Sequence, residues 1–385
     1  MSRKMCAFLL AVWAGSATAQ DVSVAYIKVE EELPPTLSNL DPIPENLGLA
    51  GALTGLEDNE TTGRFLGQNW TLTEHLVPLG EDPREAARDI LAETSYLIVD
   101  APTESVLAIA DMEEAQGALI FNSGSPAAEL RNADCRANML HTLPSVSMRT
   151  DALAQLLVLK RWDDLVMIAG AYPEDLAFAE AMENSLTKFG LSLDGRKDWR
   201  FDADMRRNAA QEVPLFTQDF GDYDALIIAD ETHDFGRYVL YNTWEPRPVI
   251  GSEGLSAEAW APVVEQWGAA QLQSRFEDAH ERSMAPRDYG AWAAMRVIGE
   301  AVTRTKAADV PTLRDYILGE DFELAGFKGR PLTFRTWNGQ LRQPIPLVHP
   351  RALVANAPLE GFLHERTELD TLGIDAAETA CTAFN

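Results

Sequence analysis

The sequence lacks the short motifs that mark the commonest nucleotide-binding and hydrolytic sites. No Gly-x-Gly-x-x-Gly fingerprint follows the first predicted strand, no Walker A sequence ends in Gly-Lys-Ser or Gly-Lys-Thr, and no Gly-x-Ser-x-Gly elbow occurs. The 6 histidines stand outside any His-x-x-x-His or Cys-x-x-Cys pattern, so zinc catalysis is not indicated. We therefore expect a protein that is not an enzyme and that has no cofactor.

Positive charge and long apolar runs are also scarce. The 385 residues include 32 Lys and Arg against 60 Asp and Glu, which gives a formal net charge of -28. Such a surface repels nucleic acid and anionic lipid headgroups, so no nucleic-acid partner is expected. No stretch reaches the roughly eighteen consecutive apolar residues that a membrane helix needs, so no membrane insertion is expected either.

The N-terminus has the pattern of a secretory signal peptide. Arg3 and Lys4 open it, residues 6–14 are apolar, and the small-residue triplet 17–19 predicts cleavage after Ala19. No cysteine stands at the cleavage position, so a lipid anchor is not expected. Removing residues 1–19 from the 385 leaves a mature chain, expected in the periplasm, that is long enough for two domains.

The mature chain keeps two cysteines, Cys135 and Cys381. An oxidising compartment favours a disulfide between them, and a bridge over so long a loop can add on the order of 5 kcal/mol to stability. Two free buried thiols are the alternative. Nothing in the sequence near either cysteine indicates a nucleophile or a metal site.

Apolar runs and turn residues predict alternating strands and helices. Strands are predicted at 22–29, 70–77, 95–100, 117–122, 165–169, 225–229 and 248–250, and helices at 48–68, 82–93, 106–115, 151–159, 175–189, 235–241 and 289–302. Asp82 as N-cap followed by Pro83 marks one helix start. Strands that alternate with helices in two series indicate two lobes, each with a parallel sheet.

The order of several sequence features resembles the type I periplasmic ligand-binding proteins. The helix at 289–302 is crowded with small and apolar residues, and the Asn338-Gly339 turn between two extended runs predicts a hairpin. The Asp82-Pro83 helix start, Thr142-Leu-Pro-Ser145 and Gly251-Ser-Glu-Gly254 complete the pattern. The resemblance implies an α/β fold of two Rossmann-like lobes with parallel sheets, joined by a multi-strand hinge.

Sequences near the C-terminus narrow the resemblance. They are found at 322–329, 337–344, 349–351 and 361–373. These sequences resemble the substrate-binding family associated with ABC transporters of pyrroloquinoline-quinone (PQQ) dependent alcohol dehydrogenase systems. Only this resemblance supplies the context of alcohol oxidation.

The resemblance also implies how the chain is divided and what it does. The N-terminal lobe is expected to comprise residues 20–140 and 252–337, and the C-terminal lobe residues 141–251 and 338–385. We expect a monomer that holds a small organic ligand between its lobes and presents it to an inner-membrane ABC permease. The alternative is a periplasmic accessory or sensor protein that delivers PQQ, a metal or a signal to the dehydrogenase system.

The first lobe is expected to offer hydroxyl groups to the ligand. In open parallel sheets, ligands bind beyond the carboxyl ends of the strands, where backbone N–H groups lack partners. Thr103 and Ser105 follow one predicted strand there, and Ser123 and Ser125 follow the next. Two alternatives remain, because residues 123–125 can form an ordinary turn and Ser105 can be a helix N-cap.

The resemblance adds two ligand residues in the second lobe. Tyr172 matches a position where the family often lays an aromatic ring over the ligand, and Asp234 matches an acidic residue that commonly meets a ligand amine. Alternatively, Tyr172 packs within the protein and Asp234 starts the following helix. In the first loop, Asp100 and Glu104 would repel a ligand carboxylate if they faced it, which favours a neutral or cationic ligand over an amino acid.

Overall fold

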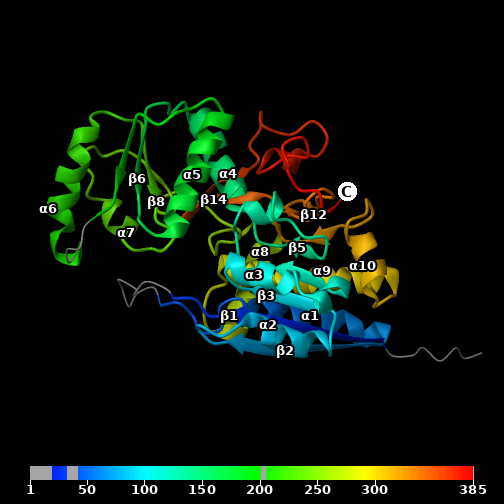
Figure 1. Cartoon of the computed structure of the whole chain (residues 1–385). Coiled ribbons are helices and arrows are strands. Elements are labelled where there is room, and N and C mark those ends of the chain that lie inside the picture. The colour runs from blue at the N-terminus through cyan, green and yellow to red at the C-terminus, as the bar shows by residue number, and fades with distance from the viewer. Residues whose placement is uncertain (1–19, 33–41, 201–204, 385) are drawn as a thin grey trace, which may run out of the picture.

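The protein consists of two α/β lobes, one at the lower right and one at the upper left of Figure 1. The computed structural model describes residues 20–32, 42–200 and 205–384. The predicted signal peptide, residues 1–19, lies outside the described residues. Each lobe is built on its own parallel sheet, so the predicted fold class is confirmed.

The first lobe has a five-stranded parallel sheet in the order β2-β1-β3-β4-β5. Its strands are β1 (Gln20–Val29), β2 (Gln68–Val77), β3 (Tyr96–Asp100), β4 (Leu119–Asn122) and β5 (Met139–His141). Every residue of β3 and β4 is buried, because helices cover both faces of the sheet. This double cover explains the nearly continuous apolar runs from which both strands were predicted.

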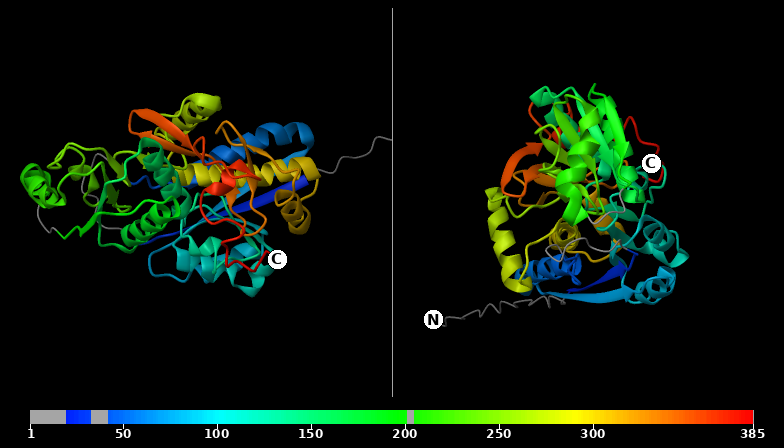
Figure 2. Two further views of the ribbon diagram at one scale, coloured as in Figure 1. Left: turned by 90° about the horizontal axis from the view of Figure 1, so that it is seen from above. Right: turned by 90° about the vertical axis from the view of Figure 1, so that its left-hand side faces the viewer.

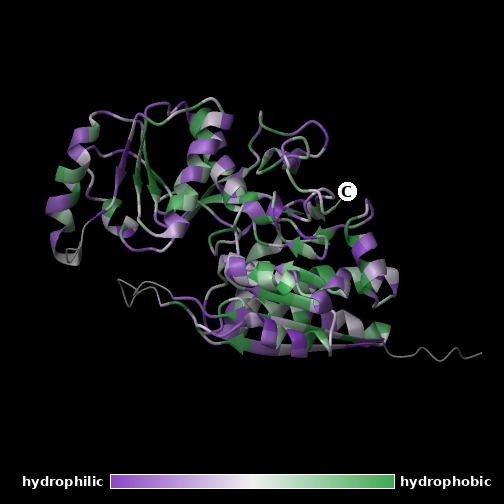
Figure 3. Cartoon of the chain, in the orientation of Figure 1, coloured by the Kyte–Doolittle hydropathy of each residue, from purple (hydrophilic) through white to green (hydrophobic). Residues whose placement is uncertain are grey.

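Helices on the two faces of this sheet form separate hydrophobic clusters. One cluster joins the sheet to α1 (Leu49–Leu66), α8 (Ala269–His280), α9 (Pro286–Thr305) and α10 (Val310–Ile317), and the other joins it to α2 (Pro83–Leu91) and α3 (Thr103–Ala110). Alternate residues of β1 point to opposite clusters, Tyr26 to the first and Ile27 to the second. Figure 3 shows the hydrophobic strands between these helices.

Glycines allow α1 and α9 to pack closely. A Cβ atom at Gly51 would lie 1.8 Å from the carbonyl oxygen of Asp288, and one at Gly55 would lie 2.8 Å from Cβ of Met295. Only glycine fits at Gly51 without moving the backbone of α9. The glycines of α1 therefore set the distance between the two helices.

The second lobe has a four-stranded parallel sheet in the order β7-β6-β8-β9. Its elements are α4 (Val146–Lys160), β6 (Leu165–Ala169), α5 (Pro173–Lys188), β7 (Gly195–Asp198), α6 (Met205–Thr217), β8 (Ala225–Ala229), α7 (Gly236–Val239) and β9 (Val249–Gly251). The strands predicted at 165–169 and 225–229 are confirmed. Helix α4 begins earlier than predicted, because the Ser145 hydroxyl accepts a hydrogen bond from the Met148 N–H and caps the helix there.

Short antiparallel sheets lie at the junction of the lobes. One sheet consists of β10 (Ser256–Ala257), β14 (Ile345–His349) and β15 (Ala352–Ala357), and the other of β11 (Leu324–Ala325), β12 (Pro331–Phe334) and β13 (Leu341–Arg342). The turn between β12 and β13 contains Asn338 and Gly339, so the predicted hairpin is confirmed. Leu341 packs in the first-lobe core and Ile345 in the second, so the chain passes between the lobes after β13.

The C-terminal segment returns from the second lobe to the first, as the left view of Figure 2 shows. Cys381 near its end forms a disulfide with Cys135, with 5.6 Å between the Cα atoms. The predicted bridge is therefore present, and the alternative of two free thiols is wrong. Among the residues that the structure describes, no helix combines the length and apolar character that a membrane crossing requires.

Candidate functional site

The first-lobe residues predicted to meet a ligand lie on two adjacent loops. Because β3 and β4 are parallel neighbours, the loops after Asp100 and after Asn122 leave the same edge of the sheet. The hydroxyl oxygens of Thr103 and Ser125 are 2.8 Å apart, and either hydroxyl can donate to the other. The structure thus brings together residues that are 22 positions apart in the sequence.

The loop after β4 is a tight turn organised by the Asn122 side chain. Its Oδ1 accepts hydrogen bonds from the N–H groups of Gly124 and Ser125, at 3.3 and 2.9 Å, and its Nδ2 donates to the Ser125 carbonyl. The hydroxyl of Ser123 is buried and donates to the Val99 carbonyl. Residues 123–125 therefore form a loop bonded to the Asn122 side chain, and the Ser123 hydroxyl already has a protein partner.

Ser105 is the third residue of α3 and does not cap it. The helix begins at Thr103, and Pro102 occupies the N-cap position with φ -57° and ψ 154°. The alternative role proposed for Ser105 is therefore wrong, because the extended backbone of Pro102 starts the helix two residues earlier.

Asp100, at the carboxyl end of β3, is a buried carboxylate with partners inside the first lobe. The Tyr26 hydroxyl donates to it at 3.0 Å, and the Arg287 guanidinium lies 3.4 Å away. Burial, together with the charge of Asp100, raises the pKa of Tyr26 well above its ordinary value, so Tyr26 stays a hydrogen-bond donor. Arg287 also pairs with Glu31, so two carboxylates share this cation.

In the second lobe, Asp175 joins the loops that carry Tyr172 and Asp234. Its carboxylate accepts from the Tyr172 N–H at 3.3 Å and from the Thr232 N–H at 3.2 Å. Tyr172 stands at the N-cap of α5 with 36% of its surface exposed, so its ring is not packed in the core. Sequence reasoning missed Asp175, because one of its hydrogen-bond donors comes from a loop 57 residues away.

Asp230, which directly follows β8, caps the short helix α7. Its carboxylate accepts from the N–H groups of Asp234, Phe235 and Gly236, at 2.8, 3.0 and 2.6 Å. The alternative in which Asp234 starts this helix is therefore wrong, because Phe235 occupies the N-cap position and Asp230 accepts from the N–H groups at the helix start. Partial burial raises the pKa of the Asp234 carboxyl.

Cations at this edge of the second lobe are already paired with carboxylates. Arg149 forms a bidentate ion pair with Glu231, in which the guanidinium donates to the two carboxylate oxygens at 2.5 and 3.1 Å. His233 lies 3.2 Å from Glu253, and that hydrogen bond raises the pKa of His233 to about 9. Neither cation is left over to hold a ligand carboxylate.

The predicted ligand residues therefore fall into two groups, one on each lobe. Thr103, Ser105, Ser123 and Ser125 belong to the first lobe, and Tyr172 and Asp234 to the second, all beyond the carboxyl ends of parallel strands. Among the described residues, no hydrogen bond or ion pair joins one group to the other. Whether all of them contact one ligand remains a prediction.

Comparison with known proteins yields matches among solved structures. No family model matches the chain, and no curated protein sequence matches it. A branched-chain amino acid ABC transporter periplasmic ligand-binding protein from Burkholderia xenovorans LB400 matches with a TM-score of 0.72 and 14% identity, over 94% of this chain and 100% of that one. This match thus covers almost the whole chain.

Two further solved structures match to a similar extent. A leucine-, isoleucine-, valine-, threonine- and alanine-binding protein from Brucella ovis, in a closed conformation, has a TM-score of 0.69 and 14% identity, with 94% and 99% of the chains covered. An ABC transporter solute-binding protein from R. palustris in complex with benzoate has a TM-score of 0.64 and 12% identity, with the same coverage. At these identities the likeness establishes the fold, and this chain has the two-lobed α/β fold of the type I periplasmic binding proteins.

Proposed function

We propose that this chain is a periplasmic solute-binding protein of an ABC transporter. It captures a small organic ligand between its lobes and delivers it, as a monomer, to an inner-membrane ABC permease. The observation that carries this proposal is the match over 94% of this chain and 100% of a periplasmic ligand-binding protein of such a transporter. The predicted signal peptide at 1–19 supports the location.

The proposed ligand contacts come from both lobes. Thr103, Ser105, Ser123 and Ser125 belong to the first lobe, and Tyr172 and Asp234 to the second. Rigid-body closure of two such lobes around a ligand is a common way for a two-lobed binding protein to work. A ligand that contacts both groups favours the closed state, because it loses half of its contacts when the lobes separate.

The ligand is proposed to be neutral or cationic. Asp234 supplies a partly buried carboxylate, and the hydroxyl pair of Thr103 and Ser125 can bond a polar oxygen or an amine. Arg149 and Arg287 are already paired with carboxylates, so a ligand anion would have to displace these pairs. Relatives in fold bind leucine and other amino acids or benzoate, so carboxylates belong in the same test.

A link to PQQ-dependent alcohol oxidation is part of the proposal. It rests on the sequences at 322–329, 337–344, 349–351 and 361–373 that resemble the corresponding substrate-binding family. On this view, the ligand is an alcohol, an aldehyde or another small compound met by such a dehydrogenase system.

Thermal-shift measurements on the mature protein, residues 20–385, test this function. The probes are alcohols, aldehydes, amino acids, other carboxylates, amines, PQQ, and calcium or lanthanide ions. A ligand at a hundred times its Kd adds about 2.7 kcal/mol of stability and raises the melting temperature measurably. A shift with small organic compounds supports the carrier, whereas a shift confined to PQQ or metal ions rejects it in favour of the accessory protein.

Variants then test the proposed contacts. Ser125→Ala and Tyr172→Ala are expected to weaken binding of the identified organic ligand by about tenfold or more each, as measured by calorimetry. Tyr241→Ala is the matched control, because Tyr241 is another tyrosine of the second lobe and is 83% exposed. Equal ligand affinities of all three variants and the unmodified protein would show that Ser125 and Tyr172 do not contact the ligand.

A further inference from the structure

The C-terminal segment 358–384 lies along the junction between the lobes and contacts both of them (Figures 1 and 2). It follows β15, contains the short 3-10 helix η5 (Glu368–Thr371), and ends beside the first lobe. Its hydrogen bonds to the rest of the protein gather in and just after η5 and near its last residues.

On one side, residues just after η5 are bonded to the second lobe. The buried carboxylate of Asp151, on α4, accepts from the Gly373 N–H at 2.7 Å and from the Lys188 ammonium at 2.8 Å. Lys188, on α5, also donates to the Gly373 carbonyl at 2.9 Å. The side chain of Leu372 is fully buried in the second-lobe core.

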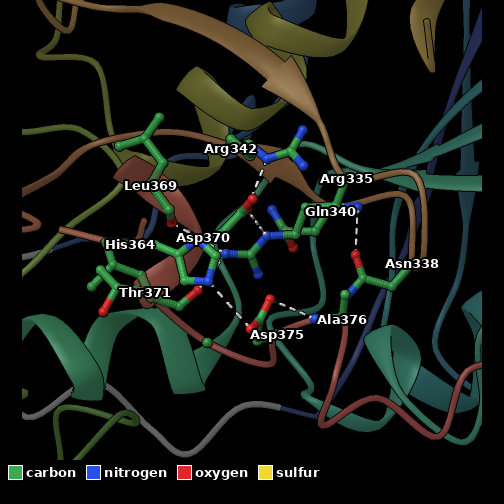
Figure 4. Close-up of polar contacts among 12 residues, drawn as sticks. Arg335, Asn338, Gln340, Arg342, His364, Leu369, Asp370, Thr371, Asp375 and Ala376 are labelled. Carbon is green, nitrogen blue, oxygen red and sulfur yellow. Dashed lines mark hydrogen bonds and ion pairs between the residues drawn. The ribbon is translucent and has the colours of Figure 1, made fainter. Parts of the chain in front are cut away.

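On the other side, Asp370 in η5 and the adjoining Leu372 are bonded to the β12–β13 hairpin. Figure 4 shows the contacts of Asp370 with Arg335 and Arg342. The guanidinium of Arg335, which is 1% exposed, donates to the Leu372 carbonyl at 2.6 Å and to the Asp370 carboxylate at 2.9 Å. Arg342 donates to the same carboxylate at 2.8 Å. Charged donors in a buried setting make these hydrogen bonds strong.

The hairpin itself belongs to the first lobe. The Gly339 carbonyl accepts from the His141 N–H at 2.8 Å, which adds the hairpin to the edge strand β5. The Gln340 side chain accepts from Arg131, a buried residue of the first lobe, at 2.9 Å. Leu372 and Gly373 therefore connect the two lobes. The Leu372 carbonyl accepts from Arg335 of the hairpin, and the Gly373 N–H donates to Asp151 of the second lobe.

The far end of the segment is fixed to the first lobe by covalent and noncovalent contacts. Cys381 is bonded to Cys135, and the Ala380 N–H donates to the Asn132 side chain at 2.5 Å. Phe384 packs against the first-lobe core beneath the Arg314 guanidinium. The segment is thus held at both ends and in the middle.

We propose that residues 358–384 form a strap that couples the two lobes at their hinge and limits how far they open. Within this strap, the Leu372-Gly373 segment, here called the clamp, is hydrogen-bonded to both lobes. The Cys135–Cys381 disulfide holds the end of the strap on the first lobe. Rotation of α4 and α5 away from the hairpin must break the hydrogen bonds on one side of the clamp. While the disulfide is intact, the rest of the strap cannot leave the first lobe to relieve that strain.

The strap goes beyond the proposed function, because it governs the motion of the lobes whatever ligand they hold. Hydrogen exchange of the mature protein measures it without any ligand. In Cys135→Ser/Cys381→Ser, backbone amides of residues 369–374 are expected to exchange about tenfold faster or more than in the oxidised protein, while β3 and β8 keep their rates. Small-angle scattering is expected to show a larger radius of gyration.

A second variant acts on the other anchor and keeps the disulfide. Asp151→Asn weakens the charged contacts to Gly373 and Lys188 and is expected to speed exchange in residues 369–374 as well. Glu183→Gln is the matched control, because it removes an exposed carboxylate that pairs with Arg196 on the same lobe. It is expected to leave residues 369–374 unchanged.

The strap is ruled out if the serine variant shows faster exchange only in residues 376–384, with wild-type rates at 369–374 and an unchanged radius of gyration. If that variant does not fold, Asp151→Asn decides alone, and wild-type exchange at 369–374 in that variant rejects the proposal. A failure of every ligand in the thermal-shift test would leave this result intact, so the two proposals fail separately.

Discussion

Buried carboxylates hold the loops at the edge of the second lobe. Asp175 and Asp230 are both inaccessible to solvent, and Thr232 Oγ1 lies 3.5 Å from each of them. Each carboxylate accepts backbone N–H groups that no helix or strand would otherwise satisfy. The arrangement fixes the backbone next to Tyr172 and Asp234 at the cost of placing two negative charges close together.

We predict an unusual pH dependence from Asp175. Burial, reinforced by the charge of Asp230, raises its pKa from 3.8 to about 6 in the folded protein. The folded state therefore binds this proton more tightly than the unfolded state, so the stabilisation is complete below pH 3.8 and is lost as the pH rises to about 6. The loss amounts to about 3 kcal/mol at most.

Asp175→Asn isolates this effect in urea unfolding between pH 4 and pH 7. The amide leaves one N–H donor poorly paired, which lowers stability at every pH by about 1–3 kcal/mol. Relative to the unmodified protein, the variant is expected to gain stability as the pH rises from 4 to 6. Asp89→Asn, an exposed carboxylate on α2, controls for the loss of one charge, and parallel curves for Asp175→Asn and the unmodified protein would refute the prediction.

At the residue scale, the sequence could predict where the proposed ligand residues stand but not which groups hold their loops in place. Thr103 and Ser125 were expected from their places after two parallel strands, and they are in contact. Asp175 stood only as the first residue of a predicted helix, and Asp230 drew no prediction, because their hydrogen bonds join loops that meet only in the folded lobe. Sequence spacing carries no information about such a contact.

At the scale of elements, the buried strands were the most predictable. The runs at 165–169 and 225–229 became β6 and β8, both buried at every residue. Strand β7 was missed, because this edge strand has the sequence Gly-Arg-Lys-Asp and its residues are only partly buried or exposed. Helix α6 was missed as well, and Pro214 inside it contradicts the usual helix pattern.

The contact between α1 and α9 yields a prediction about packing. Gly51→Ala improves the intrinsic helix propensity of α1 by about 1 kcal/mol. Its Cβ, however, would lie 1.8 Å from the Asp288 carbonyl oxygen, so the two helices must move apart. We expect urea unfolding to show that the variant is less stable by about 1–3 kcal/mol. The cost of forcing the two helices apart exceeds the gain in helix propensity.

Gly117→Ala is the control for this variant. A Cβ atom at Gly117 would meet no atom within 4 Å, and its φ lies outside the left-handed region. We expect a change within about 0.5 kcal/mol for it. Equal stability of the Gly51 and Gly117 variants would mean that α1 can shift freely, contrary to the packing described.

At the scale of the whole molecule, the two lobes followed from the repeated alternation of strands and helices. Their connection did not, because contacts at the junction join residues that are far apart in the sequence, such as Asp151 and Gly373, 222 positions apart. The disulfide between Cys135 and Cys381 was predicted from the compartment alone. The positions of the two cysteines did not predict that the C-terminal segment forms hydrogen bonds with both lobes.

The net charge of the whole molecule gives the last prediction. With 60 acidic against 32 basic residues, most charges on the surface repel one another, and this repulsion destabilises the compact state. Exposed ion pairs such as Arg84–Asp82 and Arg88–Glu114 oppose it, but water and salt screen exposed pairs, so they offset little of the repulsion. Raising NaCl from about 0.01 to 0.15 M shortens the screening length from about 30 to 8 Å.

We therefore expect added NaCl to stabilise the mature protein on the order of 1 kcal/mol, seen as a melting temperature roughly 2 °C higher or more. Calcium chloride at equal ionic strength is the control for specific binding. Within the described residues, no group of three or more His, Cys, Asp or Glu side chains is placed to hold a metal ion. A larger shift with calcium chloride than with NaCl would indicate specific calcium binding. A melting temperature that falls with NaCl would show instead that ion pairs, rather than the repulsion among acidic residues, dominate the electrostatics of the fold.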